Sequence, residues 1–230
     1  VPKDFDTNAL WYNKDLFDQA GVEYPTDDMT YDDLVALATE LKDKLPDGVY
    51  PFACPVDFQT WYYQTVYANG GWILNDDATE TGYGDAKTQE GIQCWIDMID
   101  AGLSPSASTL SETGSDAMFE GEQIAMTLAG SYMVPEYATN DTIKEKLDCV
   151  EVPTFNGVED NCINGLGFAV YEGSKQKEEA EKFAIWMGSS EAQKIQGETG
   201  VVISAREDAQ QYFAKANEQY NLAAYTNHSA

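Results

Sequence analysis

The sequence predicts an α/β fold, and two observations predict it. Short apolar runs, some of them β-branched, alternate along the chain with segments whose apolar residues recur at helical spacing. The chain has 230 residues, of which 43% are hydrophobic and 12% aromatic, a composition typical of folded proteins. A compact chain of this length buries roughly 70% of the surface that its unfolded form exposes. We therefore expect one large domain or two smaller lobes, without internal repeats.

Apolar spacing and helix-end signals predict the elements of the first half. The clearest helix covers residues 30–45, because Thr30 can cap its first turn and Asp32 and Asp33 suit the positive end of its dipole. Glycines follow the other helical segments within two residues and end them. We expect helices over residues 13–20, 30–45, 60–68 and 87–101, and a strand over residues 49–54.

The second half is predicted to continue the alternation. Residues 124–129 are apolar and partly β-branched, which favours a buried strand. Asn156 and Gly157 form a turn signal between two further strands, at 149–152 and 162–171. Helical spacing predicts helices over residues 111–120, 177–187, 191–198 and 208–220.

The charge balance excludes several classes of partner. There are 13 Lys and Arg residues against 40 Asp and Glu residues, a net charge of -27. Such a chain is repelled by nucleic acid and by anionic lipid, because it cannot release their counterions. No apolar run approaches the length that spans a bilayer. The opening residues contain neither a signal peptide nor an initiator Met, so we expect a chain that is processed or excised from something longer.

Motifs for catalysis and for metal binding are weak. There is no GxSxG, Walker or GxGxxG motif, and the single histidine, His228, lies near the end of the chain. We therefore expect no metal, no cofactor and no enzyme. Glycoside hydrolysis by two carboxylates stays open as the alternative, since 40 acidic residues offer many pairs. Free thiols and disulfides both stay open for the four cysteines, Cys54, Cys94, Cys149 and Cys162.

Aromatic and amide side chains gather where predicted strands end. Gln59 and Trp61 follow the strand at 49–54, Tyr132 follows the strand at 124–129, and Asn164 and Gly165 interrupt an apolar strand. Ligands bind at strand ends in α/β folds. An aromatic face suits the C–H face of a sugar ring, and amides and carboxylates suit its hydroxyls. Core packing is the alternative for each aromatic residue taken alone.

Five segments resemble, in order and spacing, the family 1 extracellular solute-binding proteins, the sugar-binding components of ABC importers, to which maltose-binding protein belongs. The segment over 5–17 contains a tyrosine-asparagine-lysine-aspartate motif, and 61–71 is similar to an aromatic helix that ends in a glycine pair. The segments at 121–132, 177–193 and 199–202 match later family motifs. The resemblance covers nearly the whole chain.

The resemblance implies a periplasmic-binding-protein-like (type II) fold with two lobes. Residues 1–152 would form the C-terminal lobe, residues 153–203 would return to the N-terminal lobe, and residues 204–230 would come back. Relative to the family pattern, about the first third and the terminal helices are missing. The family binds a carbohydrate between its lobes and delivers it to ABC permease subunits, at the extracellular face as a lipid-anchored protein or in the periplasm.

The resemblance also implies site residues. Asp6 stands where a family carboxylate contacts sugar hydroxyls, and Tyr132 stands where a tryptophan stacks on the sugar. Trp61 lies in the aromatic subsite segment. Asn164 and Gly165 lie on the strand that faces the cleft from the other lobe.

Three further positions receive weaker assignments. Asp57 and Gln59 lie just before the aromatic helix and are expected to line the cleft, whereas Arg206 is expected to be structural. Residues 6 and 132 depart from the glutamate and tryptophan of maltose-binding protein, so the resemblance implies a carbohydrate without implying maltose.

The resemblance implies that the missing first third would cover residues 162–187 of this chain. The strand at 162–171 is apolar almost throughout, and the helix at 177–187 carries an apolar face formed by Ala180, Phe183, Ala184 and Met187. These residues could fold back onto the larger lobe, pair with a second copy or stay mobile. We expect self-association or a rearranged segment, and weaker sugar binding than in a longer form of the protein.

Overall fold

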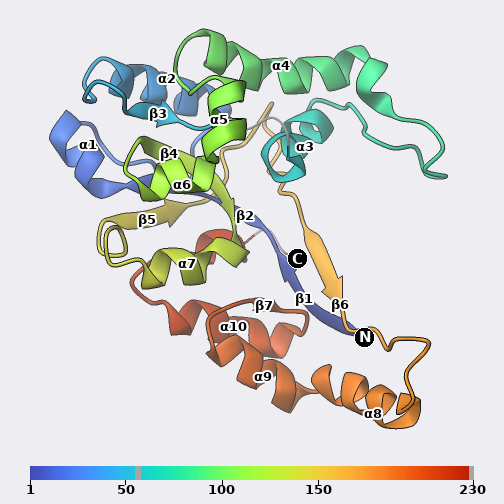
Figure 1. Ribbon diagram of the computed structural model, residues 1–230. Coiled ribbons are helices and arrows are strands. Elements are labelled where there is room, and N and C mark those ends of the chain that lie inside the picture. The colour runs from blue at the N-terminus through green and yellow to red at the C-terminus, as the bar shows by residue number, and fades with distance from the viewer. Residues whose placement is uncertain (55–57, 228–230) are drawn as a thin grey trace.

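A computed structural model describes residues 1–54 and 58–227, which contain two β-sheets (Figure 1). The larger sheet has the strand order β3 (Tyr50–Phe52), β4 (Ile124–Gly130), β2 (Asn8–Asn13), β5 (Leu147–Val150), and the smaller has the order β6 (Asn164–Gly167), β1 (Pro2–Asp6), β7 (Ile203–Ser204). Strand β1 (Pro2–Asp6) lies in the smaller sheet and β2 (Asn8–Asn13) in the larger, with Thr7 alone between them. The chain thus passes from one sheet to the other at a single residue.

The larger sheet is buried on both faces. Strand β2 pairs antiparallel with β4 (Ile124–Gly130) and with β5 (Leu147–Val150), while β3 (Tyr50–Phe52) runs parallel to β4. Every residue of β2 and β4 is buried. Leu10 and Tyr12 of β2 pack into one apolar cluster with α1 (Lys14–Ala20), α2 (Tyr31–Lys42) and α4 (Ala86–Asp100). Ala9 and Trp11, which point the other way, pack into a second cluster with α6 (Ser115–Glu120), α7 (Val134–Thr139) and the C-terminal residues.

Local sequence explains the helices around this sheet. Asn13 caps α1 (Lys14–Ala20), and Gly21 ends it with φ 63°. Thr30 and Asp33 form a capping box at the start of α2 (Tyr31–Lys42). The helix predicted over 111–120 is divided at Gly114, whose φ of 86° interrupts helical geometry, into α5 (Ala107–Thr113) and α6 (Ser115–Glu120).

Helix α3 (Gln59–Ala68) is held close to α4 (Ala86–Asp100). A Cβ atom on Gly91 of α4 would lie 2.7 Å from the Val66 Cα atom, so only glycine permits this approach. The Trp95 indole Nε1 donates to Thr65 Oγ1 (3.0 Å) across the same interface. The remaining elements beside the larger sheet are η1 (Gly82–Gly84), η2 (Ser131–Met133), α7 (Val134–Thr139) and η3 (Leu222–Tyr225).

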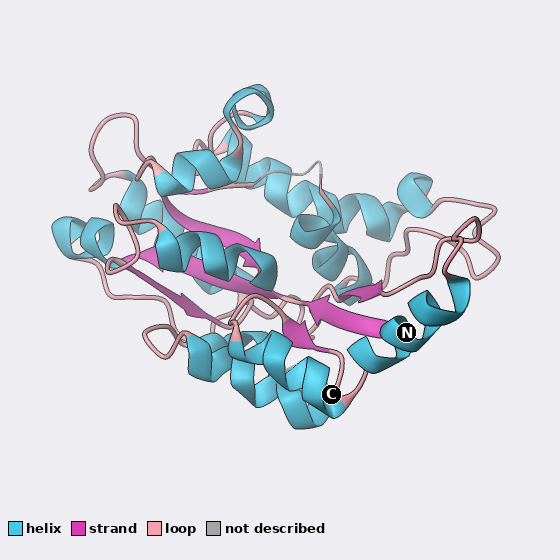
Figure 2. Cartoon of the chain, turned by 60° about the horizontal axis from the view of Figure 1, so that its bottom comes forward, coloured by secondary structure: helices cyan, strands magenta, loops and turns pink. Residues whose placement is uncertain are grey.

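Three helices accompany the smaller sheet, in which β1 pairs antiparallel with β6 (Asn164–Gly167) and β7 (Ile203–Ser204). Figure 2 shows the strands in the middle of the molecule with helices on either side. The three helices are α8 (Lys177–Met187), α9 (Ser190–Glu198) and α10 (Glu207–Ala216). Residues 1–6 are expected in the C-terminal lobe, whereas strand β1 pairs with β6 and β7.

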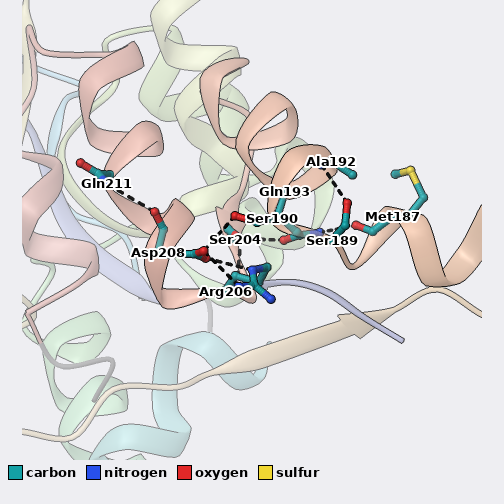
Figure 3. A network of polar contacts seen from close by, with 9 residues as sticks. All are labelled: Met187, Ser189, Ser190, Ala192, Gln193, Ser204, Arg206, Asp208 and Gln211. Carbon is teal, nitrogen blue, oxygen red and sulfur yellow. Dashed lines mark hydrogen bonds and ion pairs between the residues drawn. The ribbon is translucent and has the colours of Figure 1, made fainter.

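A buried polar network joins the helices of this part to β7 (Figure 3). The Gln193 amide Nε2 donates to the Met187 carbonyl (2.9 Å), and Ser204 Oγ donates to Gln193 Oε1 (2.6 Å). Ser204 Oγ also accepts from the Arg206 backbone N–H (3.0 Å). The Arg206 guanidinium itself binds both oxygens of the exposed Asp208 carboxylate. The structural role of Arg206 stays a prediction.

The segment over 162–187 has a shorter strand than predicted and an uncovered apolar helix. Strand β6 covers only Asn164–Gly167 and is largely exposed, and no residue of α8 is buried. The apolar side chains Phe183 and Ile185 are 62% and 67% exposed. The segment therefore does not fold back onto the larger sheet.

Two findings bear on membranes and on thiols. Within the described ranges, no helix is both long and apolar enough to cross a membrane. All four cysteines are free thiols, of which Cys54 and Cys149 are buried.

Candidate functional site

Three of the predicted site residues meet where the two sheets join. Asp6 ends β1 and pairs in register with Asn164 of β6. The Asn164 amide Nδ2 donates to Asp6 Oδ2 (3.2 Å), and the Gln59 amide Nε2, from the start of α3, donates to Asn164 Oδ1 (2.6 Å). The two hydrogen bonds that link Gln59 to Asn164 and Asn164 to Asp6 thus connect helix α3, beside the larger sheet, to the smaller sheet.

Burial dominates the electrostatics of Asp6. Its side chain is 8% exposed, and this desolvation raises the pKa of the carboxyl, as does the charge of Asp4. The hydrogen bond from Asn164 acts in the opposite direction and lowers the pKa. A carboxylate that is costly to bury and can accept further hydrogen bonds is typical of a functional site.

Tyr132 presents an aromatic surface close to these residues. It follows β4 in η2 and is 47% exposed. Burial, together with the nearby charges of Asp116 and Asp6, raises the pKa of its hydroxyl to about 12. Its ring folds over Gly130, where a Cβ atom would come within 2.2 Å of the ring. Glycine at 130 therefore permits this ring position.

The other predicted residues are placed differently. Trp61 is 7% exposed and packs in the core cluster beside Phe52 and Trp95, so its ring offers little surface to a ligand. Gly165 lies on the exposed β6 strand, and a Cβ atom there would meet no atom within 4 Å. Asp57 lies outside the described residues. The role of each in ligand binding stays a prediction.

The structure adds a cavity that the sequence analysis did not single out. Its volume is about 460 Å³, and it lies between α3 and the segment over 160–163. Its lining residues are Tyr63, Gln64, Tyr67, Asp160, Asn161, Cys162 and Ile163. Tyr63 and Tyr67 follow Gln59 at intervals of four residues, so the three side chains lie on one face of the helix. This spacing is the sequence pattern that could have indicated the two tyrosines as site residues.

No set of three or more His, Cys, Asp or Glu side chains among the described residues is arranged to hold a metal ion.

Asp116, in the first turn of α6, is a further acidic residue near Tyr132, and burial raises the pKa of its carboxyl. The site therefore offers carboxylates, amides and an aromatic face. Such groups bind hydroxyl groups and apolar ring faces.

Comparison with known proteins gives a family match and structural neighbours. The model of the bacterial extracellular solute-binding protein family matches residues 1–194. A binding protein of Brucella abortus (strain 2308) is 27% identical, and the alignment covers 95% of this chain but 53% of that protein. The chain thus spans about half the length of this relative.

Solved structures share the fold over nearly the whole chain. The ABC substrate-binding protein Lmo0181 from Listeria monocytogenes, in complex with cycloalternan, is 29% identical with a TM-score of 0.83, covering 99% of this chain and 58% of that chain. The GacH receptor of Streptomyces glaucescens GLA.O, solved unliganded and with acarbose, is 22% identical with a TM-score of 0.76, covering 96% and 59%. Maltose-bound MalE3 of T. maritima is 18% identical with a TM-score of 0.72, covering 94% and 57%. The predicted α/β fold of type II periplasmic binding proteins is confirmed, and so is the family resemblance.

Proposed function

Because this chain belongs to the bacterial extracellular solute-binding protein family, we propose that it is the carbohydrate-binding component of an ABC importer. It holds a mono- or oligosaccharide between the parts that contain the two sheets and delivers it to permease subunits. The observation that carries this proposal is the hydrogen-bonded chain Gln59–Asn164–Asp6, which joins those parts beside the exposed ring of Tyr132.

The chemistry of these groups suits a neutral sugar. Asp6 accepts hydrogen bonds only, so it fits a pair of neighbouring hydroxyl donors. The amides of Gln59 and Asn164 both donate and accept, and the Tyr132 ring can stack on the C–H face of a sugar ring. A net charge of -27 repels anionic ligands and leaves neutral ones unaffected.

The proposed lobes follow the division at residues 152 and 203, except that β1, β7 and α10, which packs against α9, are assigned to the lobe of the smaller sheet. Closure about the crossing segments would bring Asp6 and Asn164 toward Tyr132 around the sugar. We place the site of action outside the cytoplasmic membrane, lipid-anchored at the extracellular face or in the periplasm. Fractionation of the source cells tests this location.

A thermal-shift screen of mono- and oligosaccharides, followed by isothermal titration, tests the ligand class. A ligand that binds only the native state raises the melting temperature, so at least one sugar should do so. The bound glycan should be recovered intact, since we propose binding without hydrolysis. Release of reducing ends, or the absence of any shift with sugars, would contradict the proposal.

Length affects the expected affinity. This chain covers 58% of the Listeria structure, and we propose that the remaining length of such a protein contributes to the cleft. We expect any longer form that completes the length of these relatives to bind the same sugar more tightly. Equal affinities would show that the additional length contributes nothing to the site.

A further inference from the structure

A side-chain amide replaces backbone pairing where β1 and β6 separate. The antiparallel ladder of these strands ends at the pair Asp6 and Asn164, and Thr7 lies between β1 and β2. Beyond this pair, the Asn8 backbone N–H donates to Asn161 Oδ1 (2.9 Å), and Asn161 Nδ2 donates to the Asn8 carbonyl (2.8 Å). Two bonds to the N–H and C=O of one residue are the pattern of a hydrogen-bonded pair in an antiparallel sheet. The Asn161 side chain therefore extends the β1–β6 pairing to the start of β2.

Asn8 connects this contact to helix α3. Its Nδ2 atom donates to the carbonyl of Thr60 (3.0 Å), in the first turn of that helix. The preceding helix residue, Gln59, donates to Asn164 Oδ1 (2.6 Å). Two routes of hydrogen bonds thus join α3 to the segment that leads into β6, one through Asn8 to Asn161 and one directly to Asn164. Because Asn161 and Asn164 are three residues apart, fixing one restricts the position of the other.

The backbone groups that Asn161 binds are buried. Asn8 is 0% exposed, and buried N–H and C=O groups are nearly always paired in native proteins. Loss of the Asn161 amide would leave both groups of Asn8 without these partners. The chain at Asn8 would then move to find others, and Asp6, two residues earlier, would move with it. Asn161 uses both its oxygen and its nitrogen within the protein, so its effect on a ligand is exerted through Asp6 and Asn164.

We propose that Asn161 is a positioning residue of the candidate sugar site. Its amide holds the end of β1, which carries Asp6, against the start of β6, which carries Asn164. The carboxylate and amide groups next to Tyr132 thereby keep the arrangement that a sugar meets. This inference rests on the proposed function and adds to it a residue that acts on the sugar without touching it.

Two substitutions of Asn161 separate its roles as donor and acceptor. Asn161→Ala removes both hydrogen bonds. Asn161→Asp keeps the size and the acceptor, but an ionised carboxylate cannot donate to the Asn8 carbonyl, whereas a protonated carboxyl can. Asp160 precedes this position, Asp6 acts on the thiol of Cys162 after it, and α3 contains no charged residue. Both negative charges favour protonation of the introduced carboxyl, so acid should restore the contact in this variant alone.

The first readout needs no sugar. In NMR spectra, the side-chain amide signals of Asn164 and Gln59 report the hydrogen bonds that lead to Asp6. Compared with the parent chain at the same pH, Asn161→Ala should shift or broaden these signals. Asn161→Asp should do so at about pH 7.5 and match the parent chain at about pH 5. Signals unchanged in both variants would overturn the proposal, because Asn161 would then hold only its own segment.

The second readout is affinity, measured by isothermal titration with glucose and with maltose. At about pH 7.5, both variants should bind a sugar about fivefold more weakly than the parent chain. At about pH 5, that loss should disappear for Asn161→Asp and persist for Asn161→Ala. Comparison with the parent chain at equal pH removes the contribution of Asp6 itself. A purely structural role would give losses that do not respond to pH in Asn161→Asp, and this result would also overturn the proposal.

Asn75→Ala and Asn75→Asp are the matched controls. Asn75 Oδ1 likewise accepts from backbone N–H groups, those of Thr79 (2.8 Å) and Glu80 (3.1 Å), in a loop outside both sheets. These variants should change neither readout. Thermal unfolding checks that every variant is folded, and Asn161→Asp, which keeps the size of the side chain, decides the matter if Asn161→Ala does not fold. A parent chain that binds neither sugar would count against the proposed function, while the amide signals would still show whether Asn161 positions Asp6 and Asn164.

Discussion

Burial of the Asp6 carboxylate is costly, and the same group is expected to bind the sugar. One substitution tests both properties. Its pKa is raised in the folded state, so the folded protein binds the proton more tightly than the unfolded chain does. Stability should therefore fall as the pH rises from the ordinary carboxyl pKa through the raised one. Asp6→Asn should flatten this decline and weaken sugar binding by about tenfold, since the acceptor loses its charge.

Thermal unfolding across acidic to neutral pH, combined with isothermal titration, measures both effects. Asp43→Asn, at an exposed residue that ends α2, is the control and should leave both quantities unchanged. A dissociation constant for Asp6→Asn equal to that of the parent chain would remove Asp6 from the site.

Tyr132 is the aromatic residue that we expect to stack on the sugar. Stacking of aromatic type contributes about 0.5–1.5 kcal/mol beyond area burial, so Tyr132→Ala should weaken binding several-fold. Gly130→Ala should have a similar effect, because the new methyl group would displace the ring. Far-UV circular dichroism should stay that of the parent chain for both. Unfolding of Tyr132→Ala would instead assign this ring to the core.

Trp61 and Tyr132 show why residue roles were harder to predict than residue positions. Both are aromatic and both follow a strand end, so the sequence treats them alike. Trp61 turns inward because Phe52 and Trp95 belong to the same core cluster, whereas the Tyr132 ring lies over Gly130 toward solvent. Trp95 lies on a different helix, α4, and the periodicity around Trp61 contains no information about it.

At the scale of elements, helices were predicted more completely than strands. Caps and glycine stops are local, so α1, α2, α3 and α4 fall within one or two residues of the prediction, apart from the shorter C-terminal end of α2. Strands β1 and β2 were not predicted, because they contain buried Asp4, Asp6, Asn8 and Asn13, residue types that are depleted in strands. Three of these polar residues lie near the junction of the two sheets, where the candidate site is formed.

The junction of α9 with β7 depends on one buried hydroxyl. Ser204→Ala would leave Gln193 Oε1 without its donor, and an unsatisfied buried acceptor costs about 1–3 kcal/mol. Urea unfolding should show this loss. Ser190→Ala, which removes an exposed bond to Asp208, is the matched control and should have a much smaller effect. Equal losses for the two variants would mean that the buried network does not stabilise this junction.

At the scale of the molecule, an apolar surface and a large negative charge oppose each other. The face of α8 that carries Phe183 and Trp186 is exposed, and the two rings stack with their centroids 5.9 Å apart. Burying this face between two copies would be favourable, but two chains of charge -27 repel each other. Salt screens that repulsion and leaves apolar burial in place, with a Debye length of about 30 Å at 0.01 M and about 3 Å at 1 M.

We therefore expect self-association that strengthens with salt. Sedimentation equilibrium should show a mass close to that of the 25.4 kDa chain at about 0.01 M NaCl and a higher, concentration-dependent mass at about 1 M. Replacing both Phe183 and Trp186 by Ser should return the protein to a monomer at high salt, since it removes most of the aromatic surface. Leu74→Ser, at an exposed leucine on another part of the chain, should not. A monomer at every salt and protein concentration would show that this face does not pair with a second copy, whatever else covers it.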